Sequence, residues 1–198
     1  MKKEYHMSMK TNLMTAAAVF ALSTGAAFAE SHMSAAGNAM VGGAEMMPDM
    51  TIVENASNAE NLTTLVAAVQ AAGLVETLSG EGPFTVFAPT NDAFAKLDPA
   101  QLEQLMQPEN QAALAEILTC HVVAADADAE AIMGMIAADG GTHTVETVGG
   151  CMLEAAVAAD GTVTLTDERG QVATVTQADV YQSNGVVHVI DTVILPAE

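Results

Sequence analysis

The last third of the chain consists of consecutive short segments rich in Val and Thr, and this feature most limits the folds that the sequence can adopt. Before it, residues 62–69 carry Leu and Val at the i, i+3, i+4, i+7 spacing of an amphipathic helix. The Asp160-Gly161 pair favours a two-residue hairpin turn between neighbouring strands. Helices followed by hairpin-connected strands predict an α+β fold with an antiparallel sheet. The expected strands are 143–148, 151–158, 162–167, 172–180 and 185–195.

The middle of the chain carries signals for helix starts. A short strand is expected over residues 84–87, and Thr90 or Asn91 can cap the helix that follows it. Asp98 precedes a proline and is expected to cap the next helix, while Asp126 is expected to cap a later one. Several short helices should therefore precede the sheet.

The N-terminus has the parts of a secretory signal peptide. Three lysines precede the apolar stretch 13–28, and small residues flank a cleavage position after Ala29. We expect residues 1–29 to be a signal peptide that is removed, and the protein to be exported to the periplasm or the cell exterior. An uncleaved membrane anchor is the alternative.

Residues 30–50 are rich in Ala, Gly, Ser and Met and predict a flexible linker, with the folded domain over 51–197. Thioethers suit Cu(I), so an alternative function is that of a periplasmic ligand-binding or copper-binding protein that uses this Met-rich segment. The other interpretation is a low-complexity spacer, which the irregular spacing of the methionines and the lack of a nearby thiolate favour. The residues concerned are His32, Met33, Met40, Met46, Met47 and Met50.

Charge excludes two classes of partner. Lys and Arg total 5 against 25 Asp and Glu, which gives a formal net charge of −20. Nucleic-acid binding and docking on anionic lipid both depend on Lys and Arg, so neither is expected. An acidic, self-repelling surface favours a soluble monomer.

The chain has two cysteines, Cys120 and Cys151. In an oxidising compartment an even number favours pairing, so we expect a disulfide between them. Two buried free thiols are the alternative.

Three segments together resemble the fasciclin domain family. They are Phe84–Phe94, Asn184–Pro196 and, between them, Leu118–Val123, where the family has a Tyr-His pair and this chain has Cys120-His121. The resemblance covers about residues 51–196. The matching signature residues are Thr85, Phe87, Ala88, Pro89, Thr90, Asn91, Phe94, Asn184, Gly185, His188 and Asp191.

This resemblance implies a fold of helices packed on antiparallel sheets arranged as a wedge or sandwich. It also implies a secreted, single-domain, bacterial-type fasciclin protein that mediates cell adhesion through an unidentified surface protein or glycan. The family is not generally enzymatic, so neither a catalytic residue nor a cofactor or metal site is expected.

In animal members of the family, partner recognition is attributed to an Asp-Ile pair that precedes the segment matching Asn184–Pro196 here, and to the Tyr-His region. The matching positions here are Asp179-Val180 and His121, which are therefore the candidate partner-binding residues. Cys120 replaces the tyrosine, so a contact that depends on a phenol ring does not carry over. For His121 and His188 the other interpretation is a core histidine whose two ring nitrogens are hydrogen-bonded.

Overall fold

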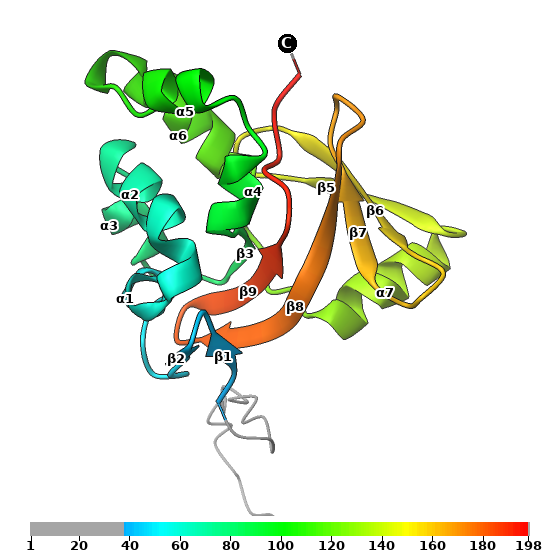
Figure 1. The fold of residues 1–198 in the computed structure, drawn as a ribbon. Helices are drawn as coiled ribbons and strands as arrows, with labels where there is room; N and C mark the ends of the chain where they lie inside the picture. The colour runs from blue at the N-terminus through cyan, green and yellow to red at the C-terminus, as the bar shows by residue number, and fades with distance from the viewer. Residues whose placement is uncertain (1–37, 198) are drawn as a thin grey trace, which may run out of the picture. The chain divides into compact units, whose positions relative to one another are not determined.

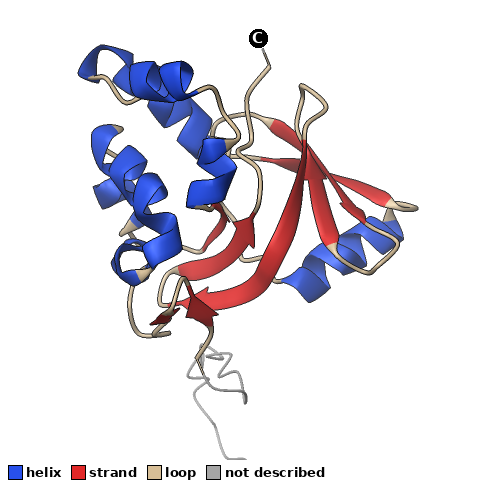
Figure 2. Ribbon diagram, in the orientation of Figure 1, coloured by secondary structure: helices blue, strands red, loops and turns tan. Residues whose placement is uncertain are grey.

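The helices of the first half of the domain gather on one side of a twisted sheet in the computed structural model, which describes residues 38–197 (Figures 1 and 2). A further helix, α7, packs against β5 and β6 at the other end of the sheet. The helical segments are α1 (Ile52–Asn58), η1 (Glu60–Leu62), α2 (Thr63–Ala71), α3 (Val75–Leu78), α4 (Asn91–Ala95), α5 (Pro99–Leu105), η2 (Pro108–Asn110), α6 (Gln111–Thr119) and α7 (Ala129–Ala138).

The main sheet has seven strands in the order β4-β3-β9-β8-β7-β6-β5. From β5 to β9 each strand pairs antiparallel with the next, as the hairpin pattern predicts. The α+β fold class is therefore confirmed. The strands are β3 (Phe84–Pro89), β4 (Val122–Val123), β5 (Thr142–Glu146), β6 (Met152–Val157), β7 (Val163–Thr166), β8 (Val172–Gln182) and β9 (Gly185–Ile190).

The pairing of β3 with β9 departs from the expected antiparallel sheet, because these two strands run parallel. Their register runs from Phe84 opposite Gly185 to Pro89 opposite Ile190. Hairpin rules describe neighbours in sequence, whereas these strands come from opposite ends of the domain. The sheet is therefore mixed, and the two segments that resemble the fasciclin signature lie side by side as its second and third strands.

Strands β3 and β9 are flanked by other strands in the sheet and are buried on both faces. Val86 and Ala88 of β3 pack into an apolar cluster with α1, α2 and α6, whereas Phe87 packs into a second cluster with α7 and β6. Successive side chains of a strand point to opposite faces, so one strand serves both clusters. The signature segments thus hold the helical side and the β5–β8 side together.

Residues 38–50 are ordered, which differs from the flexible linker expected over 30–50. Two short strands, β1 (Met40–Val41) and β2 (Ala44–Glu45), form a hairpin. Val41 is 2% exposed and Met46 is 3% exposed, and both belong to the helical-side core. The Asn55 side chain fixes the segment by hydrogen-bonding both the N–H and the carbonyl of Met47. The expected signal peptide and residues 30–37 lie outside the described residues.

Two of the expected helix caps are confirmed, and the expected cap of α7 is wrong. The Thr90 hydroxyl accepts the N–H of Ala93, and the Asp98 carboxylate accepts the N–H of Ala100. Helix α7, however, is capped by Asp128 and not by Asp126, because α7 begins at Ala129. Within residues 38–197, no helix is both long enough and apolar enough to cross a membrane.

Candidate functional site

The polar side chains of the β3 and β9 segments are directed at one loop, residues 124–128, that leads into α7. The Thr85 hydroxyl donates to the carbonyl of Ala125 (2.7 Å) and accepts the N–H of Ala127 (2.9 Å). His188 Nε2–H donates to the carbonyl of Ala127 (2.9 Å). Both side chains are 1% exposed. Because Thr85 and His188 are buried on two paired strands, their hydrogen bonds hold this loop against the sheet.

The other nitrogen of His188 is also hydrogen-bonded. Nδ1 accepts the backbone N–H of Asp179 at 3.3 Å, which fixes the tautomer that carries its proton on Nε2. The ring stacks on Phe87 with centroids 5.6 Å apart. Burial lowers the pKa of His188, with partial compensation from the Ala127 carbonyl and from nearby carboxylates. The imidazole therefore acts as a neutral linker between β9, β8 and the loop.

Asp179 lies at a bulge in β8 and reaches the start of α7. The β8–β9 register shifts between Gln177 and Val180, and Asp179 has a φ of 57°, which is left-handed backbone. Its Oδ1 accepts the N–H of Ala129, the first residue of α7, at 2.7 Å. A carboxylate at a helix N-terminus is electrostatically favourable. Asp179 therefore holds the first turn of α7 in place and is also partly exposed at the surface.

Val180 and His121 lie where a partner cannot reach them, which differs from their expected role as partner contacts. Each is 1% exposed. The alternation along β8 turns Val180 into the helical-side core. His121 Nδ1–H donates to the carbonyl of Ile117 (2.8 Å), and Nε2 accepts the N–H of Ile194 (2.9 Å). Burial lowers the pKa of His121 to about 4.

Two signature asparagines hold the ends of helical segments to neighbouring elements. Asn91 accepts the N–H of Thr64 and donates to the carbonyl of Glu60, and so joins α4 to the start of α2. Asn184 accepts the N–H of Ile52 and donates to the carbonyls of Leu78 and Gly80, and so joins the β8–β9 turn to α1 and α3. These amides satisfy backbone groups at helix ends that have no partner within the helix.

The first residue after β9, Asp191, carries a salt-bridged carboxylate. Asp191 Oδ1 accepts the N–H of Thr174, and Oδ2 lies 3.2 Å from Lys96 Nζ. The other cation within residues 38–197 is Arg169, whose Nε donates to the carbonyl of Pro196 at 2.7 Å. Both basic side chains therefore contact the segment that follows β9.

The disulfide between Cys120 and Cys151 is present, with Cα atoms 5.3 Å apart. It joins the end of α6 to the residue before β6, and both cysteines are buried against α7. The bond therefore ties the helical region to the hairpins.

Within residues 38–50 the methionines lie in different surroundings. Met46 is buried in the core, Met40 is exposed, and Met47 Sδ accepts from Asn38 Nδ2 at 3.5 Å. Over residues 38–197 no group of three His, Cys, Asp or Glu side chains is arranged to hold a metal ion. His32 and Met33 lie outside the described residues. Burial of Met46 removes one of the sulfurs that the copper hypothesis would use.

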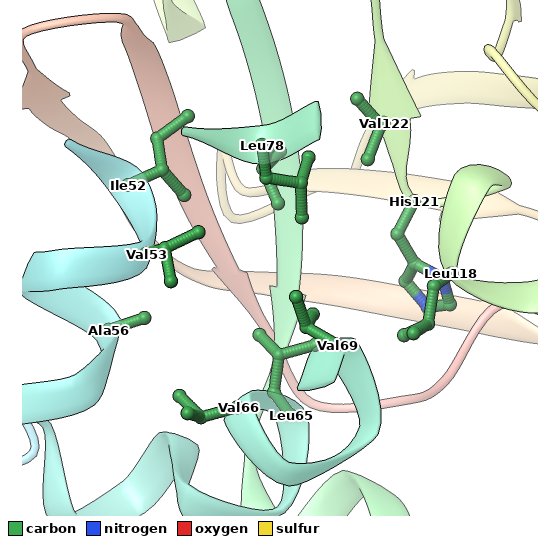
Figure 3. Close-up of a pocket in the computed structure, with 11 residues that line it drawn as sticks. Ile52, Val53, Ala56, Leu65, Val66, Val69, Leu78, Leu118, His121 and Val122 are labelled. Atoms are coloured by element: carbon green, nitrogen blue, oxygen red, sulfur yellow. The ribbon is translucent and has the colours of Figure 1, made fainter. Parts of the chain in front are cut away.

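An apolar pocket, which sequence patterns did not indicate, opens between the helices (Figure 3). Its total volume of about 430 Å³ includes solvent at its open mouth and the narrow gaps between its walls, so the enclosed part is much smaller. The sequence shows which faces of the helices are aliphatic. It does not show that these faces leave a space between them when the helices pack. The lining comes from α1, α2, α3, β3, α6 and β4: Ile52, Val53, Ala56, Leu65, Val66, Val69, Leu78, Val86, Leu118, His121 and Val122.

Comparison with known proteins agrees with this architecture. The sequence profile of the family described as Fasciclin domain matches residues 60–196. Protein sll1483 of Synechocystis sp. is 50% identical over 147 residues, which cover 74% of each chain. Cell surface glycolipoprotein MPB83 of Mycobacterium bovis is 37% identical over 146 residues, which cover 71% of this chain and 58% of that protein.

A solved structure has the same fold. It is the FAS1 domain pair from the insect cell adhesion molecule fasciclin I, with a TM-score of 0.52 and 24% sequence identity. The match covers 64% of this chain and 42% of the insect chain.

Proposed function

The chain belongs to the fasciclin domain family, and from this premise we propose that it is an exported, non-catalytic binding module that mediates cell adhesion. Its partner would be a surface protein or a glycan in the periplasm or at the cell exterior. The observation that carries the proposal is family membership. The names of two similar proteins place one at a cell surface and describe the other as a cell adhesion molecule.

The hydrogen bonds of the signature residues support a binding role. Thr85, Asn91, Asn184 and His188 all bond to backbone groups of neighbouring elements. Their chemistry is therefore used to hold loops and helices in place, as a scaffold that presents a surface requires.

We place the contact surface around Asp179 and the loop that it holds. Asp126 is exposed there, and Asp128 and Asp179 are partly exposed. Burial raises the pKa of Tyr181, and the negative charges of Asp179, Asp128 and Asp126 raise it further. These exposed and partly exposed carboxylates support an acidic contact surface where β8 meets α7.

The test is attachment and aggregation of a strain that lacks the gene, complemented with wild type, Asp179→Asn or Asp179→Ala. Asparagine keeps the acceptor for the Ala129 N–H and tolerates left-handed backbone, but removes the charge. We expect wild type to restore attachment, and Asp179→Asn to fail although it remains folded and more stable than Asp179→Ala.

Two other outcomes are informative. If Asp179→Asn restores attachment and only Asp179→Ala fails, the residue is structural and the contact lies elsewhere. If deletion changes neither attachment nor aggregation under several growth conditions, the adhesion proposal is wrong.

A further inference from the structure

The pocket lined by α1, α2 and α6 is partly open to solvent, and Figure 3 shows the side chains of its walls. Val53 and Ala56 of α1 and Val66 of α2 are partly exposed, whereas Leu78 and Leu118 are buried. In Figure 3 the α1 side chains line one side, and Leu118 and His121 line the opposite side. Space of this kind in a protein interior forgoes packing contacts that a ligand can supply.

The walls offer a ligand no hydrogen bond from a side chain. Among the lining residues, His121 alone has a polar side chain. Both of its ring nitrogens are already bonded, to the Ile117 carbonyl and the Ile194 N–H, so the ring presents carbon to the pocket. A polar group placed here would lose its water without gaining a partner. The part of a ligand that enters must therefore be hydrocarbon.

The lining also favours an aliphatic chain over a ring. Ten of the lining residues are Ala, Val, Leu or Ile, and no Phe, Tyr or Trp is among them. An aromatic ligand would therefore find no offset-stacked or edge-to-face partner other than the edge of His121. A flexible alkyl chain can follow an irregular aliphatic groove.

The charges near the pocket select the head of the ligand. Residues 52–78, which form α1, η1, α2 and α3, carry Glu54, Glu60 and Glu76 and contain neither Lys nor Arg. The cations of the described chain, Lys96 and Arg169, contact the segment after β9. A carboxylate or phosphate head would meet negative charge without a counter-ion. We propose that this pocket binds the alkyl chain of an uncharged amphiphile.

The test is a titration of the purified protein, labelled at its Ile, Leu and Val methyl groups, followed by NMR. The probe is n-decanol, and decanoate at neutral pH is the matched anion. We expect saturable shifts of the Ile52, Val69 and Leu118 methyl groups with n-decanol, and binding of decanoate that is weaker by about tenfold or more. Shifts scattered over other apolar groups, or equal binding of the two probes, would overturn the proposal.

Two matched substitutions locate the binding. Ala56→Leu places a larger side chain in the mouth of the pocket, whereas Ala67→Leu makes the same change at an exposed position of α2. We expect the first variant to weaken n-decanol binding by about tenfold or more while remaining folded, and the second to bind like wild type. If both variants bind like wild type, the pocket is not the site. The inference does not depend on adhesion, because the attachment assay and this titration read different surfaces.

Discussion

Nε2 of His121 accepts the backbone N–H of Ile194 at 2.9 Å, so a neutral imidazole holds the segment after β9 against the end of α6. The acceptor exists only while Nε2 is unprotonated. The other nitrogen donates to Ile117, so a second proton on the ring would replace a hydrogen bond by two opposed donors. This contact leads to the first prediction.

Stability should fall in mild acid because of His121. Burial lowers its pKa from 6.5 to about 4 in the folded protein. The unfolded chain therefore binds this proton first, so the contribution is fully present above about pH 6.5 and is lost as the pH falls towards 4. The loss amounts to about 3 kcal/mol.

Two measurements check this prediction. The ring resonances of His121 in the folded protein should titrate near pH 4. In urea unfolding, His121→Gln should flatten the change in stability between pH 7 and pH 4 more than His143→Gln, a matched change on β5. A ring that titrates at its ordinary pKa would contradict the assignment.

The Cys120–Cys151 bond should contribute a large part of the stability. Its sequence separation is 31 residues, and a loop of that size corresponds to about 3–4 kcal/mol in the chain-entropy description. We expect the Cys120→Ala/Cys151→Ala double variant to lose about this much in guanidinium unfolding, and added reductant to change wild type but not the variant. Equal midpoints for the two proteins would show that the bond adds nothing.

Substitutions at Asp179 should separate its two structural roles. Asparagine keeps both the acceptor for Ala129 and the tolerance for a φ of 57°, glycine keeps only the second, and alanine keeps neither. The expected order of stability is Asp, then Asn, Gly and Ala, with alanine lower than wild type by about 2 kcal/mol. Thermal unfolding measures the order, and an alanine variant as stable as the asparagine variant would show that the cap is unimportant.

Two glycines should respond in opposite directions to alanine. A Cβ at Gly185 would overlap the carbonyl group of Phe84, where β9 meets β3, and the backbone there has a φ of 153°. Gly134 lies within α7, and a Cβ there would meet nothing within 4 Å. We expect Gly185→Ala to destabilise by about 3 kcal/mol or more and Gly134→Ala to stabilise by about 0.5–1 kcal/mol. Urea unfolding of the two variants beside wild type measures both, and a tolerated Gly185→Ala would mean that the strand ends can separate.

Local sequence patterns predicted the local elements. Thr90 and Asp98 have the side chains that caps require, and the Asp160-Gly161 turn joins two strands as expected. The choice of Asp128 over Asp126 depended on where α7 begins, and two aspartates two residues apart give the same local signal.

Long-range relations were not visible in the sequence. The parallel partner of β3 lies at the far end of the domain, and the order of residues 38–50 depends on the reach of Asn55. The pocket arises from how α1, α2 and α6 pack, which periodicity does not describe. For the candidate site, the family resemblance suggested Asp179, which stays a prediction, whereas the burial of Val180 and His121 required the structure.

The parallel pair of β3 and β9 also has a consequence for how the protein is made. Strand β3 lies between β4 and β9 in the sheet, so its second edge stays open until the last strand has been synthesised. A nascent chain that ends before Gly185 therefore displays an apolar strand edge to any neighbour. Because β3 pairs with a strand that is distant in sequence, this part of the sheet can form only after β9 has been synthesised. Until then, protection of the open edge of β3 from other chains would limit aggregation.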